Sequence, residues 1–307
     1  MNPLRFAVPF VPCLLLLLPL AAQDTFQLAP AAGASMSFAY KLTQKQEFDA
    51  GGQQGEVNQE IAADYVATIM AIAEDGTRSV KIAFGHIRGK LETPMQDPVE
   101  FDTAKTAADQ EGVQAGVAAL VGKEFTAKIG FDGKVTDIAG FTDAAAAARK
   151  AAGQQARLLD SIVTDNALAN LVRGAIGPMP KEPVAVGAKW KRSEDSGNTL
   201  QTTRTMEYSL AKADADTAEV AATGTLASKA GTEGKGELAG AKIEDGKIEG
   251  KTIMSRKDAF PVRSDSKATF TVVAMGAEID ITIQIVVERA AAKPAKAEAP
   301  ADPKPAK

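Results

Sequence analysis

Apolar and polar residues alternate along most of this chain, and this period of two restricts the folds open to it. The clearest run lies near the C-terminus, where five apolar residues are each separated by one residue: Ile279, Ile281, Ile283, Ile285 and Val287. Similar runs cover residues 36–42, 57–73, 80–84, 206–210 and 220–226. Because successive side chains of a strand point to opposite faces, these runs predict half-buried antiparallel strands, apolar inward and polar outward.

Turn residues stand between several of these runs. Asp-Gly pairs at 75–76, 132–133 and 245–246 supply the positive φ angles that tight hairpin turns require. Residues 214–216 and Gly276 predict two further turns. The spacing therefore favours strands joined to their sequence neighbours by hairpins.

One stretch departs from the period of two. Between Thr142 and Arg173 the apolar residues recur at helical spacing: Leu158, Leu159, Ile162, Val163, Leu168, Leu171 and Val172. Thr142 and Asp143 are expected to cap a helix, and Gly174 is expected to end the helical segment. A shorter helix is predicted over 113–121. The segment has no strongly basic face, so we expect it to pack on the sheet rather than on a membrane surface.

The predicted fold is mainly β, of the α+β kind: a long-stranded, curved antiparallel sheet or half-barrel with a central helical segment packed on it. Envelope carriers of the lipoprotein-carrier type share this architecture, which does not by itself transfer a function. The alternative is a two-sheet sandwich with an inserted helical segment. The 307 residues suffice for one large domain or for two, and the pattern leaves both open.

The first residues have the order of a secretory signal. Arg5 is followed by an apolar stretch over 6–20 and by the small residues Ala21 and Ala22. An uncleaved anchor is the competing interpretation. Cleavage after residue 22 would remove Cys13, the sole cysteine, and would exclude disulfides and thiol chemistry from the mature protein. The sequence thus predicts an exported protein, periplasmic or secreted, without a transmembrane segment after cleavage.

The predicted organisation has six parts. They are a signal peptide (1–22), an N-terminal linker (23–34), a first β-rich half (35–141), a helical segment (142–180), a second β-rich half (181–289) and a tail (290–307). The tail contains Ala, Pro and Lys with two acids, and is predicted to be disordered. The formal net charge is −4, and the body is more acidic than this because the tail is basic. An acidic body argues against nucleic acid as a partner.

Three stretches carry a resemblance to a known group of proteins. They read LVGKEF at 120–125, FDGKV at 131–135 and PVAVGAKW at 183–190. Together with the signal and the early long strands, they resemble an uncharacterised family of exported bacterial proteins, of a kind common in planctomycetes and their relatives. The resemblance spans most of residues 35–289. It implies an exported β-rich architecture and supplies no activity or catalytic residue.

His86 is the sole histidine, and it follows Val80, Ile82 and Phe84 in phase. One histidine cannot build a histidine-rich metal site, although it could serve a Ser-His-acid triad. No G-x-S-x-G pattern surrounds a serine. A histidine near a strand end, without a catalytic role, is therefore the preferred interpretation.

Two motif-like stretches do not satisfy the chemistry that they suggest. Residues 245–252 approach a phosphate loop, but aspartate occupies position 245, where glycine is needed. Ser209–Lys212 and Ser264–Lys267 match S-x-x-K. On a strand, however, residues three apart point to opposite faces, so each serine is separated from its lysine.

Acidic pairs at 74–75, 194–195 and 244–245 are expected in solvated turns. Trp190 is expected to anchor the first strand of the second half in the core, and the lining of a binding pocket is the alternative. The sequence therefore predicts no catalytic, metal-binding or cofactor-binding residue and no cofactor.

Three functional hypotheses remain. The first is a non-enzymatic envelope protein that binds an apolar ligand or a partner protein. The second is a structural or surface scaffold without a small ligand. The third is a hydrolase whose site is assembled from scattered residues.

Overall fold

The computed structural model describes residues 26, 31–50, 53–94, 96–105, 111–159, 162–196, 201–229, 240–274 and 277–290. Its strands are β1 (Ser35–Ala50), β2 (Gln53–Ile72), β3 (Arg78–Glu92), β4 (Val99–Asp102), β5 (Glu124–Ile129), β6 (Val135–Ala139), β7 (Lys189–Ser196), β8 (Thr202–Ala213), β9 (Thr217–Ser228), β10 (Lys242–Ser255), β11 (Pro261–Ala274) and β12 (Ala277–Arg289). Its helices are α1 (Gly112–Ala118), α2 (Phe141–Ala152), the 3-10 helix η1 (Gly153–Leu159) and α3 (Asp165–Ile176).

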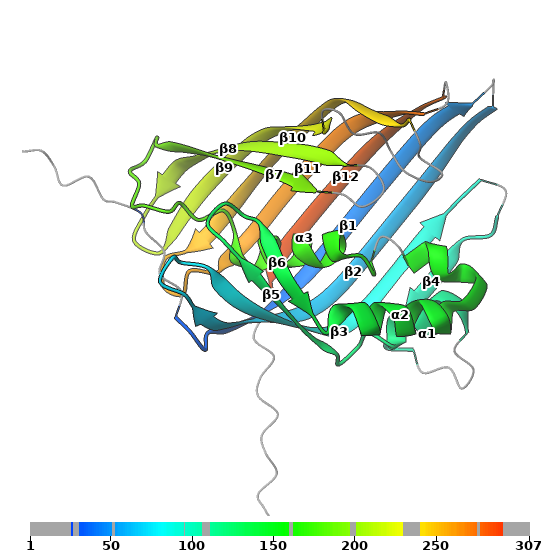
Figure 1. Cartoon of the computed structure of the whole chain (residues 1–307), viewed down its shortest axis with the longest axis horizontal. Helices are drawn as coiled ribbons and strands as arrows, with labels where there is room; N and C mark the ends of the chain where they lie inside the picture. Colours follow the sequence, from blue (N-terminus) through cyan, green and yellow to red (C-terminus); the bar gives the residue numbers. More distant parts are fainter. Residues whose placement is uncertain are drawn as a thin grey trace, which may run out of the picture.

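The described strands form one antiparallel sheet, which is curved and does not close (Figure 1). Their order is β6-β5-β3-β2-β1-β12-β11-β10-β9-β8-β7, and β4 pairs with β3 on the β5 side. The predicted long-stranded curved sheet is confirmed, and the two-sheet sandwich is wrong.

The first and last strands lie side by side in the middle of this sheet. The β1–β12 ladder runs from Phe38 opposite Arg289 to Asp49 opposite Glu278. β1 also pairs with β2, from Ser35 opposite Thr68 onward. The two halves of the sequence are therefore continuous through their backbone hydrogen bonds, and they share one core.

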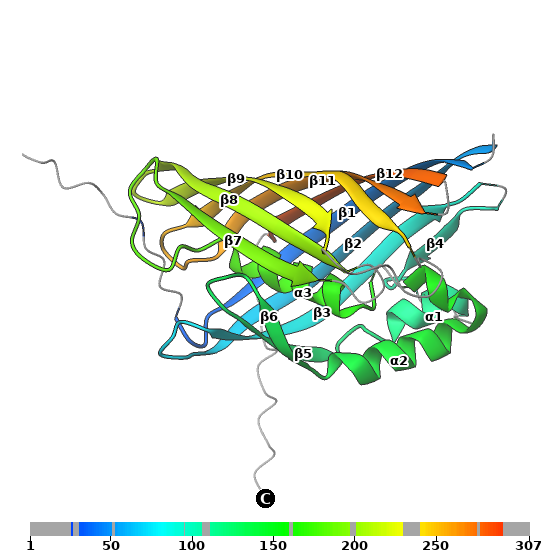
Figure 2. The same cartoon turned by 45° about the horizontal axis from the view of Figure 1, so that its top comes forward.

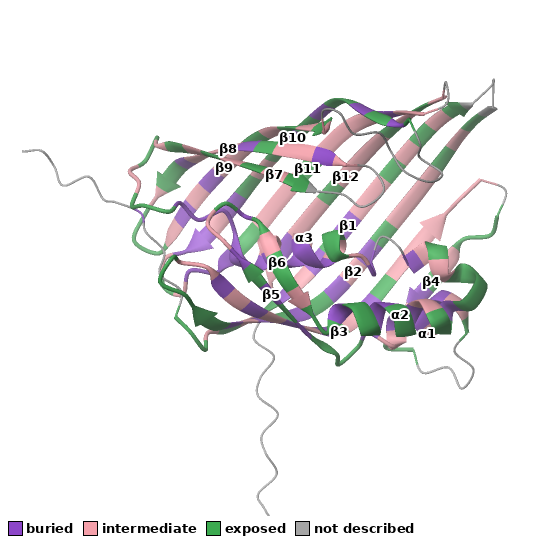
Figure 3. Ribbon diagram, viewed as in Figure 1, coloured by how far each residue is buried: buried purple, intermediate pink, exposed green. Residues whose placement is uncertain are grey.

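The alternation places the apolar residues on one face, and α3 lies against that face (Figures 1 and 2). Thr164 caps α3, because its side chain accepts a hydrogen bond from the Ala167 N–H at 3.2 Å. Leu171 is buried, and its carbonyl accepts a hydrogen bond from the Tyr65 hydroxyl at 3.4 Å. In Figure 3, α3 lies in front of the strands and is partly purple, the colour of buried residues. This helix therefore covers the centre of the inner face.

The predicted helical segment and the shorter helix are both present, but two boundaries differ from the sequence interpretation. Gly140, with a φ of 78°, is the cap of α2, in place of Thr142. α3 continues through Gly174 to Ile176. A Cβ at position 174 would lie 2.9 Å from Val287 Cγ2. This glycine therefore allows close packing of α3 on β12 and does not end the helix.

The predicted turns at 75–76, 132–133 and 214–216 are present. In the last of these, the Asp214 carboxylate accepts the N–H of Asp216 at 2.9 Å and that of Thr217 at 2.7 Å. The hairpin predicted at 245–246 is wrong, because these residues form a bulge within β10. Asp245 has a φ of 50° there. A bulge demands the same backbone freedom as a turn, which explains the error.

Several predictions concern residues outside the described ones. The signal peptide at 1–22, Gly276 and residues 291–307 of the tail lie there. Within the predicted linker, Phe26 is buried and exchanges backbone hydrogen bonds with Val184. Each helix in the described part of the chain is too short or too polar to cross a membrane.

Substitution of Phe38 tests how much the packing at the centre of the core contributes to stability. Its ring stacks on Tyr65 at 5.4 Å between centroids and meets Phe260 edge-on at 6.1 Å. We expect Phe38→Ala to lower the free energy of unfolding by about 3–5 kcal/mol, because it leaves a cavity in the core. Val66→Ala, on the opposite face and 38% exposed, should cost about 1 kcal/mol or less. Urea denaturation measures both, and equal losses would contradict this description of the core.

Candidate binding site

The face opposite α3 carries a broad concavity of about 650 Å³ near β1–β4. Lys45, Lys90 and Glu92 are among its lining residues. Lys45 pairs with Glu56 at 3.0 Å, and Lys90 pairs with Glu92 at 2.7 Å. All four side chains are at least 44% exposed. Surface pairs of this kind contribute little to stability, and they give this face a solvated polar character.

His86 lies beside this concavity because of a bulge in β3. Ile87 is opposite Ala63 and Phe84 is opposite Tyr65, so two residues of β3 face one of β2. The extra residue moves Ile87 to the inner face and His86 to the outer face. The predicted phase of His86 with Phe84 is therefore wrong, and His86 lies mid-strand rather than near a strand end.

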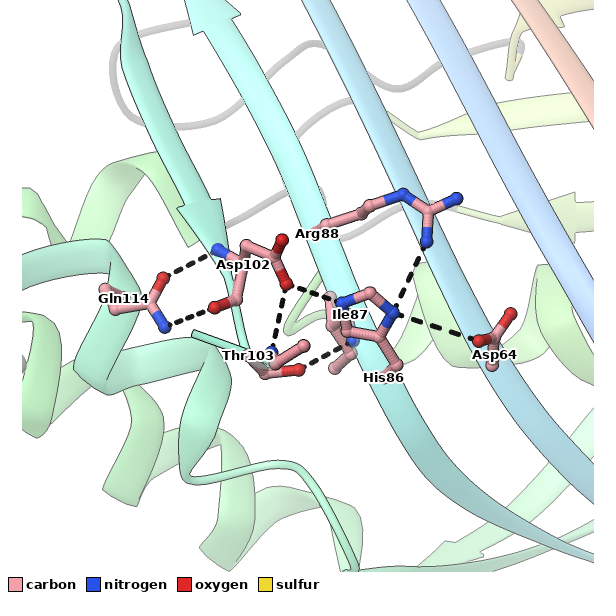
Figure 4. A network of polar contacts seen from close by, with 8 residues as sticks. Asp64, His86, Ile87, Arg88, Asp102, Thr103 and Gln114 are labelled. Atoms are coloured by element: carbon pink, nitrogen blue, oxygen red, sulfur yellow. Dashed lines mark hydrogen bonds and ion pairs between the residues drawn. The ribbon is translucent and has the colours of Figure 1, made fainter. Parts of the chain in front are cut away.

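The His86 ring contacts three polar side chains on this face (Figure 4). Nε2 lies 2.6 Å from Asp102 Oδ1, and Nδ1 lies 3.9 Å from Asp64 Oδ2. Arg88 Nη1 lies 3.3 Å from Nδ1. The His86 hydrogen bond, followed by one from the Ala104 N–H, lowers the pKa of Asp102 below its ordinary value.

The same network fixes β4 and α1 to β3. The Gln114 amide of α1 donates to the Asp102 carbonyl at 2.9 Å and accepts from the Asp102 N–H at 2.7 Å. The Thr103 hydroxyl lies beside this network and accepts a hydrogen bond from the Ile87 N–H at 2.9 Å. Figure 4 thus shows a polar clamp that joins β3, β4 and α1.

The other sequence candidates are dispersed. Ser264 faces inward and shares a hydrogen bond with Thr252 at 2.9 Å, whereas Lys267 is exposed on the other face. Residues 245–252 lie within β10, as the strand interpretation requires. Glu74 and Asp75 occupy a turn, as predicted. Among the described residues, no three His, Cys, Asp or Glu side chains gather as a metal site.

A second concavity lies on the inner face, between α3 and strands β8–β12. Its volume is about 110 Å³. One row of paired residues crosses the sheet beneath it: Ile285, Ser266, Gly250, Ala222 and Tyr208. Three neighbouring members of this row are small, so the strands leave space under the helix that larger side chains would fill.

Apolar residues continue from this cavity along the inner face. Ile248 lines the cavity. Further along, Ile243 and Val272 form a second apolar cluster with partly buried neighbours that include Phe270 and Ile281. The inner face therefore carries apolar residues both in the cavity wall and further along β10 and β11.

One side of the cavity is charged. Arg192 and Glu194 of β7, Arg204 of β8 and Arg173 of α3 line it. The Glu194 carboxylate lies 2.9 Å from Arg173 Nη2 and 3.7 Å from Arg204 Nη1. Burial lowers the pKa of Arg173, and the charge of Glu194 opposes this effect. Burial likewise lowers the pKa of Arg192, whose Nη2 donates to the Met179 carbonyl at 2.6 Å.

The predicted solvated turn at 194–195 is therefore wrong, because both residues belong to β7 and Glu194 is 11% exposed.

The sequence did contain a pattern that points to the charged residues of this cavity. Arg204 is in phase with the apolar row Met206, Tyr208 and Leu210, and Glu194 is in phase with Trp190. A charged residue in phase with an apolar row indicates an interior charge or a strand end, and alternation alone does not distinguish them.

Trp190 packs against the main core, as the first of its two predicted roles, an anchor of β7, requires, and it does not itself line the cavity. Its ring stacks on Tyr208 with 5.7 Å between centroids and an interplanar angle of 20°. Tyr208 itself lines the cavity. The sole tryptophan of the chain is thus one ring away from the candidate site.

The fold and cavity define an open half-barrel with a helix against its inner face. The chain belongs to DUF6263, a family of unknown function, whose model matches residues 75–261. No curated protein matches the sequence. The family assignment agrees with the expected uncharacterised family and adds no activity.

Solved structures show only distant similarity. A lipovitellin structure concerned with lipid–protein interactions is 10% identical, with a TM-score of 0.43, and the match covers 86% of this chain and 26% of that one. The COG4313 outer membrane channel from Pseudomonas putida F1 is 7% identical, with a TM-score of 0.29 and coverages of 85% and 97%. DynF from the dynemicin biosynthesis pathway of Micromonospora chersina is 8% identical, with a TM-score of 0.22 and coverages of 96% and 94%. At these scores the similarities define neither a common fold nor a common ligand.

Substitution of Asp102 tests whether the His86 network holds β4 against β3. We expect Asp102→Asn to accelerate amide hydrogen exchange at Ile87 and Thr103, because β4 loses its bond to His86. Asp64→Asn is the matched control, since Asp64 is 3.9 Å from the ring, and it should leave that exchange nearly unchanged.

The pH dependence has a defined sign. Because the folded pKa of Asp102 is lowered, its contribution to stability is complete above the ordinary value of 3.8 and is lost as pH falls through the folded value. The stability difference between wild type and Asp102→Asn should therefore shrink below pH 3.8. A difference that grows at low pH would contradict this assignment.

Proposed function

We propose that this protein is an exported, non-enzymatic carrier that binds an apolar ligand on the inner face of its half-barrel. The observation that carries the proposal is the row of small residues beneath α3. It leaves a cavity whose walls include the apolar residues Met206, Ile248 and Ile285 of β8, β10 and β12. Concave sites with mostly apolar walls and a few polar groups are typical of small-molecule binding.

The size of the cavity limits how such a ligand binds. An apolar cavity of about 150 Å³ in another protein accommodates benzene. Pockets that enclose drug-sized ligands have volumes of about 300 Å³ or more. A cavity of about 110 Å³ therefore accepts one end of a longer molecule, whose remainder lies along the apolar residues of the inner face toward Ile243 and Val272.

Two further features support export and a non-enzymatic role. The order of charged, apolar and small residues over 1–22 is that of a secretory signal. The sole histidine is engaged in the clamp between β3, β4 and α1, away from the inner face. Both features agree with a protein that holds a ligand outside the cytoplasm without transforming it.

The location of the ligand can be tested by quenching of Trp190 with bromododecanol, a neutral apolar probe. We expect saturable quenching, because bromine acts at short range and Trp190 stacks on a residue of the cavity wall. Ala222→Phe should abolish the quenching, because its ring occupies the space above the small-residue row. Native mass spectrometry should show one probe per wild-type chain.

Ala221→Phe is the matched control. Ala221 is adjacent to Ala222 but faces outward, opposite Lys251. This variant should be quenched like the wild type. A folded wild-type protein that neither quenches nor retains the probe would refute the carrier and leave the scaffold hypothesis.

A further inference from the structure

The charged side of the cavity contains donors that the protein leaves unused. Among the described residues, the Nε atoms of Arg192 and Arg204 are buried and have no hydrogen-bond partner. The Nε1 atom of Trp190 is in the same condition, so that three unpaired donors accompany one unpaired acceptor, Glu194 Oε2, which forms an ion pair with Arg173 Nη2 at 2.9 Å. Both arginines line the cavity, and all three residues lie on the inner face of β7 and β8. Buried donors are nearly always paired in native proteins, so a cluster of unpaired ones calls for an acceptor.

The net charge of the cluster also favours an anionic acceptor. Arg173, Arg192 and Arg204 face one buried carboxylate, Glu194. Asp132 lies at the rim and is exposed, so water screens it. Glu249, Lys251 and Asp265 also border the cavity, but the strand register places their side chains on the outer face. The side chains of the inner face therefore keep an excess of positive charge even when Asp132 is included. Arg78 adds a further buried guanidinium nearby, over the ring of Phe131 at 4.8 Å.

The arginines of the cluster also have a structural role, which accounts for some of their hydrogen-bond donors but not for all of them. Arg173 Nε donates to the Gly133 carbonyl at 3.1 Å, and Arg192 Nη2 donates to the Met179 carbonyl. These bonds join α3, β7 and the β5–β6 turn. They use other nitrogens than the Nε atoms of Arg192 and Arg204. The unused donors thus remain after the structural contacts have been satisfied.

We propose that Arg192 and Arg204 bind the anionic headgroup of an amphipathic ligand, either a fatty carboxylate or an alkyl phosphate. This proposal rests on the proposed function and specifies its substrate class. Guanidinium groups suit carboxylate and phosphate oxygens because their donors lie in one plane. The alkyl chain of the ligand then follows the apolar residues of the inner face away from the arginines.

The test compares probes of one chain length by titration of Trp190 fluorescence. Dodecanoate and dodecyl phosphate carry the anion, dodecanol is neutral, and dodecyltrimethylammonium is a cation. Acetate and inorganic phosphate supply the free anions without a chain. We expect both anionic amphiphiles to bind about tenfold more tightly than dodecanol, the cation to bind most weakly, and the free anions not to saturate the signal.

Arg204→Gln removes one guanidinium and keeps Glu194 paired with Arg173. It should abolish the preference for dodecanoate over dodecanol while dodecanol still binds. Arg88→Gln removes an arginine from the outer concavity and should preserve the preference. If Arg204→Gln does not fold, the salt dependence of binding by the wild-type protein still tests the headgroup site. Added salt should weaken dodecanoate binding and leave dodecanol binding unchanged.

The outcomes separate the two proposals. Equal binding of dodecanoate and dodecanol by the wild type would overturn the headgroup site and leave the apolar carrier intact. Binding of inorganic phosphate as tight as that of dodecyl phosphate would overturn the amphipathic ligand in favour of a free-anion site. A wild type that binds none of the alkyl probes would refute the carrier itself.

Discussion

The pairing of β1 with β12 is the constraint on which the rest of the structure depends. It joins the first strand to the last over the span from Phe38–Arg289 to Asp49–Glu278. From β1 and β12 the sheet extends outward in both directions, and apart from β3–β5 each further pair on this path joins strands that are consecutive in the sequence. Because both edges curve to the same side, α3 is placed between them and buries its apolar face against β1–β3.

The interior combines two opposed physical demands. Tight packing is achieved where Gly174 lets α3 approach Val287. Space is left a short distance away, where Gly250 and Ala222 lie side by side on β10 and β9. Burying guanidinium groups beside this space is costly, and a single carboxylate cannot compensate all of them. An anionic ligand would relieve this imbalance, which connects the packing to the proposed function.

The two faces of the sheet differ in what they can do. On the outer face, ion-paired lysines and glutamates and the His86 clamp leave a hydrated surface that holds β4 and α1 in place. On the inner face, the charged residues Arg173, Arg192, Glu194 and Arg204 gather at one cavity. The separation follows from strict alternation, because every position on a strand belongs to one face or the other.

A bulge changes this assignment by one residue. In β3 the bulge at Gly85 and His86 moves Ile87 inward, and in β10 the bulge at Asp245 and Gly246 restores the inward phase of Ile248. A one-residue slip reverses every later side chain on a strand. Alternation read from the sequence is therefore reliable only as far as the next bulge.

The sequence alone determined the mainly β class, the approximate helical segment and several turns, because period, caps and Asp-Gly pairs are local properties. It also supplied the expectation of export, which rests on residues 1–22. It did not identify Arg192, Glu194 and Arg204 as a group, since charged residues in phase with apolar rows are ambiguous in one strand. Only the tertiary structure brings them to one cavity beside Arg173, because the pairing of β7 with β8 and the position of α3 are set by contacts far apart in the chain.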